Sequence, residues 1–275
     1  MQSEREAGRR YVLGNEAQEL ARLDAQAASI EQPTRLLLQA ASLTRGMRVL
    51  DLGTGLGHVA RLAGEIVGPD GSVVGVDQSA AVLAAARERT MQAGMTHVTF
   101  VEANVLDWQP SESFDAIVGR LLLFHVPDPA AVVRHYRAIL KPGGLFVAID
   151  FDLGGARSEP PVPVVDLTLR RVTDAFRAAG AWPRIGARLG AILEEAGLAG
   201  VTTLGIQPYS SPRDVSGPRL LSGVARSLAP AMIAHGIATA DELDIATLEQ
   251  RIADAVRAAG AMIVLPTVVG AWGRA

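Results

Sequence analysis

Three alternate glycines follow an acidic residue in the stretch Asp51-Leu52-Gly53-Thr54-Gly55-Leu56-Gly57. Glycine has no Cβ, so a chain with this spacing can adopt positive φ angles, and a ligand can lie directly against its backbone. Residues 48–52 are predicted to form a buried strand, and residues 57–67 the helix that follows it. The free N–H groups at the start of such a helix point at the ligand. The stretch therefore predicts a nucleotide-type site in an open α/β sheet.

The spacing of the glycines distinguishes two kinds of ligand. The dinucleotide-binding pattern G-x-G-x-x-G requires a glycine where this chain has His58. Asp51 lies two residues before the first glycine, and its carboxylate suits a ligand that carries a positive charge, whereas it would repel a pyrophosphate. An oxidoreductase with a nicotinamide cofactor is therefore kept only as an alternative interpretation.

Four further landmarks follow the glycine turn in order and at regular spacing. They are Asp77 after the predicted strand 72–76, Glu102-Ala103-Asn104-Val105, Phe114 to Arg120, and Leu140-Lys141-Pro142-Gly143-Gly144. With Asp51-x-Gly53-x-Gly55-x-Gly57, this series resembles the class I S-adenosylmethionine (SAM) dependent methyltransferases over roughly residues 36–152. The resemblance implies SAM as cofactor, S-adenosylhomocysteine (SAH) as product, and methyl transfer as activity.

The resemblance also implies which residues contact the cofactor. Asp77 is implied to accept hydrogen bonds from the ribose hydroxyls, with Gln78 beside the adenine. Asn104 and Val105 are implied to contact the adenine, because an amide both donates to and accepts from a purine edge. The full implied set is Tyr11, Asp51, Gly53, Thr54, Gly55, Asp77, Gln78, Asn104, Val105 and Arg120.

Two charged residues are assigned to the methionine end of SAM. Asp51 is expected to organise the glycine turn and to reach the ammonium group, directly or through water. Its alternative role is that of a buried acid that caps local N–H groups. Arg120 is expected to meet the methionine moiety through its backbone carbonyl or, with its guanidinium, through the carboxylate. Its alternative role is that of a surface arginine.

Candidates for the chemical step are fewer. Methyl transfer from a sulfonium is an in-line displacement, so alignment of the acceptor supplies much of the acceleration, and a base is needed only if the acceptor must lose a proton. His125, just past the fourth strand, is the candidate base, although a histidine packed at a helix start is the common alternative. Asp150 and Asp152 are expected to face the cleft, and Asp152 and His235 are the candidate substrate contacts. No histidine or carboxylate spacing indicates a metal site.

Two segments narrow the acceptor. Gly119 to Leu122 stand where the amino-methyltransferases of DNA carry an N/D-P-P-Y motif. Phe124 to Pro129 and the C-terminal Gly270 to Arg274 are closer to ubiquinone/menaquinone-type and natural-product methyltransferases, which implies a small-molecule acceptor in secondary metabolism. The accepting atom, O, N or C, stays open. A SAM-binding protein without transfer activity is a third interpretation.

The elements that must position these residues alternate regularly. Strands are predicted at 48–52, 72–76, 98–101, 114–118 and 144–150, and helices between them at 57–67, 79–93 and 128–140. This alternation predicts an α/β, Rossmann-like, doubly wound and mostly parallel seven-stranded sheet. The expected division is an N-terminal helical lid (1–46), a SAM-binding core (47–152), and helical lid inserts with the last two strands (153–275).

Breaks are expected at two prolines. Pro33 is expected to end a first helix, with Thr34 capping a second one through Ala41, and Pro230 is expected to separate helices within residues 213–260. Ala261 to Leu265 and Val268 to Trp272 are expected to be β-rich, with the last strand antiparallel in the sheet.

Composition excludes several classes of protein. The 275 residues carry a formal net charge of −3 and no long basic run, which argues against a nucleic-acid partner. The absence of cysteine excludes disulfides and thiolate chemistry. The N-terminus does not resemble a signal peptide, and no apolar run has the length of about 18 residues needed for a membrane span. A cytoplasmic monomer or homodimer is expected.

Overall fold

The computed structural model describes Asp24 and residues 27–275, so Tyr11 lies outside the described residues. The chain forms two compact units, each built from separate segments. The described part of the first contains residues 27–155, 181–208 and 266–275, and that of the second contains residues 156–180 and 209–265, with Asp24.

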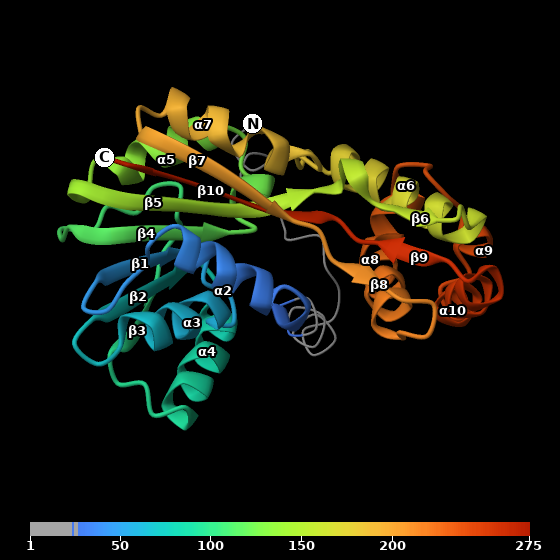
Figure 1. Cartoon of the computed structure of the whole chain (residues 1–275), viewed down its shortest axis with the longest axis horizontal. Coiled ribbons are helices and arrows are strands. Elements are labelled where there is room, and N and C mark those ends of the chain that lie inside the picture. The colour runs from blue at the N-terminus through green and yellow to red at the C-terminus, as the bar shows by residue number, and fades with distance from the viewer. Residues whose placement is uncertain (1–23, 25–26) are drawn as a thin grey trace, which may run out of the picture. The chain divides into compact units, whose positions relative to one another are not determined.

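A seven-stranded sheet forms the centre of the first unit, in the order β3-β2-β1-β4-β5-β10-β7 (Figure 1). β10 is antiparallel to both β5 and β7, and the other neighbouring pairs are parallel. The predicted doubly wound, mostly parallel sheet is confirmed, as is its antiparallel last strand. The strands are β1 (Arg48–Leu52), β2 (Ser72–Asp77), β3 (Val98–Glu102), β4 (Phe114–Arg120), β5 (Leu140–Asp152), β7 (Ala199–Ile206) and β10 (Thr267–Arg274).

Helices cover both faces of this sheet. Successive residues of a strand point to opposite faces. A Cβ added to Gly270 of β10 would meet Leu37 of α2, whereas one added to Gly273 would meet Leu198, which follows α7. α2 and α7 therefore lie on opposite faces. The helices of this unit are α2 (Glu31–Ala40), α3 (His58–Val67), α4 (Ala80–Gln92), α5 (Pro129–Arg137) and α7 (Leu189–Glu195), with short 3-10 helices η1 (Leu123–His125), η2 (Leu153–Gly155) and η3 (Ile185–Arg188).

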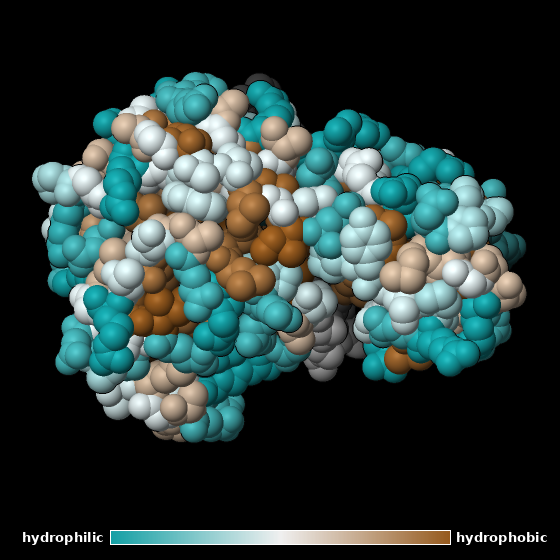
Figure 2. All heavy atoms as spheres, in the orientation of Figure 1, coloured by the Kyte–Doolittle hydropathy of each residue, from teal (hydrophilic) through white to brown (hydrophobic). Residues whose placement is uncertain are grey.

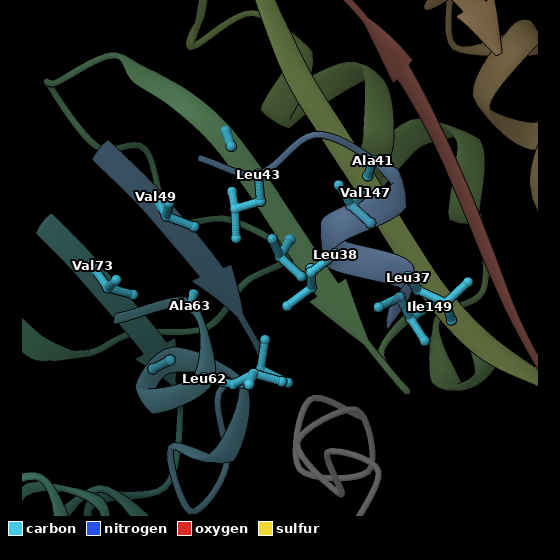
Figure 3. Packing of buried hydrophobic residues seen from close by; sticks show 14 of the residues in the cluster. Leu37, Leu38, Ala41, Leu43, Val49, Leu62, Ala63, Val73, Val147 and Ile149 are labelled. Atoms are coloured by element: carbon cyan, nitrogen blue, oxygen red, sulfur yellow. The ribbon is translucent and has the colours of Figure 1, made fainter. Parts of the chain in front are cut away.

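The main core lies between the sheet and the helices α2 and α3. Leu37 and Leu38 of α2 are completely buried beside the strands (Figure 3). Burial of each such leucine side chain contributes about 2 kcal/mol to folding. The cluster also includes Val49, Leu62, Ala63, Val73, Val147 and Ile149. This packing holds α2 against α3, β5 and β10.

The prediction that Pro33 ends one helix and Thr34 starts another is wrong. α2 begins at Glu31 and contains both residues. A proline in the first turn costs little, because the N–H it lacks has no partner within the helix there. Thr34 is fully buried, and its hydroxyl donates to the carbonyl of Ile30 at 2.6 Å. The helix predicted before Pro33 lies mostly outside the described residues.

The described part of the second unit combines a small sheet with four helices. Its strands β6 (Arg157–Glu159), β8 (Tyr209–Ser210) and β9 (Met262–Val264) pair antiparallel in the order β6-β9-β8. The β-rich run expected at residues 261–265 therefore belongs to this small sheet. The helices are α6 (Pro163–Ala178), α8 (Ser216–Ala234), α9 (Ala240–Leu243) and α10 (Leu248–Ala259).

Pro230 does not separate helices, contrary to the prediction, but lies inside α8. Its side chain is exposed, so water can reach the carbonyl that loses its helical partner. α9 begins after Thr239, whose side chain forms a capping box with Glu242.

A cavity of about 40 Å³ lies among the helices of the second unit. Arg171 and Arg251 line it, and both bond backbone carbonyls, those of Glu242 and Leu243. The space admits a few water molecules but no aromatic metabolite.

The surface is mostly polar on the face shown in Figure 2, where hydrophilic residues surround smaller groups of hydrophobic ones. In the described part of the chain, no helix has both the length and the apolar character that a membrane crossing requires.

Candidate cofactor-binding site

The glycine turn has the backbone geometry that its sequence predicts. Gly53, Gly55 and Gly57 have φ angles of 66°, 51° and 72°, which favour glycine. Among the described residues, none has an atom within 4 Å of a Cβ added to Gly55, so none of them fills the space against the backbone there. The turn connects β1 to α3 at the carboxyl edge of the parallel strands (Figure 1). Ligands of open α/β sheets bind at this edge.

Asp51 is a buried acid beneath this turn. Its side chain is 1% exposed, and the hydroxyl of Thr54 donates to its Oδ2 at 2.6 Å. Among the described residues, Oδ1 has no hydrogen-bond partner. Burial raises the pKa of Asp51 to about 7, although Thr54 and Arg120 counteract the increase. An acceptor with an unfilled bond therefore lies directly under the glycine turn.

Arg120 places a positive charge on the same side of the sheet. It ends β4, the strand next to β1, and its Nη1 donates to Thr34 Oγ1 of α2 at 3.1 Å. Burial lowers the pKa of Arg120 to about 10, and the negative charge of Asp51 opposes that decrease. Asp51 and Arg120 together present opposite charges, as the amino and carboxyl groups of an amino-acid ligand require.

Asp77 closes the turn from the neighbouring strand β2. Its Oδ2 accepts from the N–H of Gly55 at 3.0 Å, and its Oδ1 accepts from the N–H of Ser79 at 3.0 Å. Each carboxylate oxygen has two lone pairs, so both can accept a further hydrogen bond from a ribose. Gln78 follows at the exposed rim.

Asn104 and Val105 follow β3 at the same edge of the sheet. Asn104 is exposed, and its Oδ1 accepts from the N–H of Leu106 at 3.0 Å, which orients the side-chain amide. The carbonyl of Val105 accepts from the hydroxyl of Tyr136 at 2.9 Å. Burial, aided by Asp107, raises the pKa of Tyr136 to about 12, so this hydroxyl stays a donor at neutral pH.

The structure gives less support for the predicted catalytic and substrate residues than for the predicted cofactor residues. His125 is an exposed residue of η1, and its ring lies edge-on to Phe124 with centroids 5.0 Å apart. Asp152 accepts from the N–H of Gly154 at 2.9 Å and lies 3.5 Å from Arg184 Nε. His235 is the C-cap residue that follows α8 in the second unit. The roles of these residues stay predictions, as does that of Tyr11 outside the described residues.

Asp150 does not face the cleft, contrary to the expectation from its position on the strand. It is fully buried, and its Oδ2 accepts from the N–H of Phe124 in η1 at 3.3 Å. Burial raises the pKa of Asp150 well above its usual range. The strand pattern placed it on a face of β5 but did not show that η1 folds over that face.

Sequence reasoning missed two residues of the site. Thr34 binds Arg120, and because 86 residues separate the two in the chain, the sequence gave no signal for this contact. Leu122 lies over the glycine turn, because a Cβ added to Gly53 would be 3.3 Å from Leu122 Cδ1. Only its place just after β4 could have indicated it.

A metal centre has no support in the described part of the chain, where no three histidine, aspartate or glutamate side chains are grouped to hold an ion.

Comparison with known proteins agrees with this geometry. The methyltransferase domain family matches residues 43–197. A 2-phytyl-1,4-naphtoquinone methyltransferase of Synechococcus elongatus is 34% identical over 125 residues, which are 42% of this chain and 51% of that protein. A demethylmenaquinone methyltransferase of Listeria welshimeri is 32% identical over 120 residues, which are 43% of this chain and 48% of that protein. The chain thus spans about half the length of these curated relatives.

Solved structures share the fold. The YcgJ protein of Bacillus subtilis has a TM-score of 0.57 at 20% identity, with 87% of this chain and 97% of that one covered. A methyltransferase-like protein of Bacillus halodurans has a TM-score of 0.56 at 20% identity, with 88% and 97% covered. The family match, the sheet order and the glycine turn show that the chain belongs to the methyltransferase domain family, the class I SAM-dependent methyltransferases.

Proposed function

We propose that this protein transfers a methyl group from SAM to O, N or C of a small-molecule acceptor with apolar or aromatic character. The observation that carries the proposal is Oδ1 of Asp51, a buried carboxylate oxygen without a partner among the described residues. It lies under a glycine turn at which no described residue fills the space facing Gly55. A buried acceptor with an unfilled bond costs stability, and a ligand with an ammonium group would remove that cost.

The surrounding residues fit SAM group by group. In the proposal, Asp51 accepts from the ammonium and Arg120 donates to the carboxylate. Asp77 accepts from the ribose hydroxyls, with Gln78 beside the adenine. The amide of Asn104 bonds the adenine edge, next to Val105. Gly53, Thr54 and Gly55 provide the backbone against which the methionine chain lies.

In methyl transfer, the residues of this chain hold the cofactor in position and, where the acceptor must lose a proton, take up that proton. Bound SAM supplies a methyl group on a positively charged sulfur, which an acceptor atom takes by in-line displacement. The protein holds the cofactor's two ends and excludes water with the apolar side chain of Leu122. For an acceptor that must lose a proton, His125 is the proposed base, because it is exposed just beyond β4.

An aromatic acceptor is supported by two observations. The relatives named above methylate a phytyl-naphthoquinone and demethylmenaquinone, as their names state. Leu121 and Leu122, which follow Arg120, present half-buried apolar side chains where the acceptor would approach. Reduced 1,4-naphthoquinones are therefore the first acceptors to test.

Two measurements test the proposal. Calorimetry with SAH is expected to show binding, and Asp51→Asn is expected to weaken it, whereas Asp115→Asn on the opposite end of the strands is the matched control. Incubation with methyl-labelled SAM and a panel of naphthoquinols, phenols and amines is expected to give a labelled product. Binding without transfer to any acceptor would favour a SAM-binding protein without activity. Absence of SAH binding with NADH binding would favour an oxidoreductase.

A further inference from the structure

A buried carboxyl connects β5 to the segment that follows β4. Asp150 has no exposed surface, and its Oδ2 accepts a hydrogen bond from the N–H of Phe124 at 3.3 Å. Its Oδ1 has no hydrogen-bond partner among the described residues. Asp150 thus lies beneath η1 and contacts its backbone.

Further hydrogen bonds hold the segment of residues 121–125, which contains η1. The N–H of Leu121 donates to the carbonyl of Ile149 at 2.8 Å, and the carbonyl of Phe124 accepts from the N–H of Trp182 at 3.0 Å. Leu121 itself has a φ of 55°, a conformation that leucine rarely adopts. Such a conformation persists only where the surrounding structure imposes it, and strain of this kind is concentrated at functional sites.

Two side chains of the segment 121–125 bear on the proposed reaction. Leu122 Cδ1 lies over Gly53 of the glycine turn, and His125 is exposed at the end of η1. A displacement of η1 would therefore move both the apolar contact with the glycine turn and the candidate base. The position of η1 matters to both halves of the proposed reaction.

Stability does not explain the presence of an acid at residue 150. A carboxyl that is buried with an unfilled acceptor reduces the stability of the folded state, and burial raises the pKa of Asp150 well above its usual range, with the N–H groups of Leu123 and Phe124 partly offsetting the increase. Ala148 and Phe146, two and four residues earlier on the same face of β5, are buried apolar residues. An apolar side chain would therefore suit this environment better.

We propose that Asp150 is a positioning residue for methyl transfer, which holds η1 against β5 so that Leu122 stays on the glycine turn and His125 keeps its place at the end of η1. This inference rests on the proposed function. Asp150 acts through the backbone of η1 and has no contact with cofactor or acceptor in this proposal.

Two variants separate positioning from a purely structural role. Asp150→Val removes the acceptor, whereas Asp150→Asn keeps an acceptor oxygen in nearly the same volume. In Asp150→Val, amide exchange at Phe124 is expected to be about fivefold faster relative to global unfolding, which corresponds to loss of one hydrogen bond. SAH affinity is expected to fall by about the same factor, while the urea midpoint is unchanged or higher. Asp150→Asn is expected to restore both values to within about twofold of wild type.

Thr90→Val is the matched control. Thr90 is also buried, and its hydroxyl has no partner among the described residues, but it lies on α4. This variant is expected to change neither Phe124 exchange nor SAH affinity. The proposal would be overturned if Asp150→Val showed the same Phe124 amide exchange and the same SAH affinity as wild type. It would also be overturned if both Asp150 variants lost stability and SAH affinity to the same degree. If wild type binds no SAH, the proposed function fails and the positioning role fails with it, whereas fast Phe124 exchange in Asp150→Val would still show the anchor itself.

Discussion

Arg120 Nη1 and Thr34 Oγ1 are 3.1 Å apart, although 86 residues separate them in the chain. The bond ties the end of β4 to α2 and fixes the guanidinium on the side of the sheet where Asp51 is buried. Hydrogen bonds to a charged group contribute about 1.5–3 kcal/mol when buried. The orientation of Arg120 therefore depends on a helix that precedes the glycine turn.

Thr34→Val is expected to weaken SAH binding about fivefold, because the guanidinium loses its fixed orientation. Thr168→Val is a close control, since Thr168 Oγ1 donates to the carbonyl of Val164 at 2.6 Å, the same bond that Thr34 makes to Ile30. Both variants lose one helix-internal bond, and only Thr34→Val is expected to change affinity in calorimetry. Equal affinities in the two variants would refute the role of Thr34.

Asp51→Asn is expected to change how stability depends on pH. Burial raises the pKa of Asp51 from 3.8 to about 7, so the folded state binds a proton that the unfolded state has released across this interval. The free energy of unfolding that Asp51 contributes therefore falls as pH rises from about 4 to 7, by at most about 4 kcal/mol. Urea unfolding at several pH values measures the free energy of unfolding of wild type and variant. The value for wild type minus that for Asp51→Asn is expected to decrease as the pH rises.

Asp115→Asn is a control for which the pH dependence of stability is expected to have the opposite sign. Lys141 and the N–H of Arg48 lower the pKa of Asp115, so its contribution is present above the ordinary pKa and is lost as the pH falls through the lowered value. A pH-independent difference for Asp51→Asn would show that the buried acid keeps an ordinary pKa.

SAH affinity is expected to decrease below about pH 7, because an ammonium ligand binds the ionised form of Asp51. The decrease approaches about tenfold per pH unit while one proton must be released on binding. Calorimetry between pH 5.5 and 8.5 measures it, and Asp51→Asn should bind weakly with little dependence on pH. A flat profile for wild type would contradict contact between Asp51 and the ammonium.

Gly55→Ala is expected to weaken SAH binding at least tenfold, since the added methyl group occupies the space against which the ligand would lie. Gly94→Ala is matched in backbone terms, because Gly94 also has a positive φ (67°) and no atom of a described residue within 4 Å of an added Cβ. Both changes should cost about 1–2 kcal/mol of stability from the left-handed backbone conformation. If Gly94→Ala weakens binding equally, the effect is one of stability and not of the site.

Local signals in the sequence were sufficient for the sheet and for the glycine turn. The apolar strands and the turn glycines each depend on signals within a few residues, and both were predicted correctly. Two prolines were misjudged for a reason that is also local. Pro33 lies in a first turn and Pro230 on an exposed face, and in these places a proline costs a helix little.

Contacts between segments that are distant in the chain could not be predicted from such local signals. The bond between Thr34 and Arg120, the contact of Leu122 with Gly53 and the burial of Asp150 each join segments that the sequence does not connect. The run at 261–265 was recognisable as a strand, but its partners β6 and β8 lie far away in the chain. Which sheet a short strand joins is decided by these distant partners.

The order of strands in the large sheet has a consequence for how the protein is made. β7 is paired only with β10 in the described sheet, and β10 comes after all segments of the second unit. While the ribosome is still adding residues 209–265, β7 has no neighbour to bond, and the far edge of β5 stays open to other chains. The helical unit is thus translated between two strands that need each other, so a pause there would lengthen the period of exposure to aggregation.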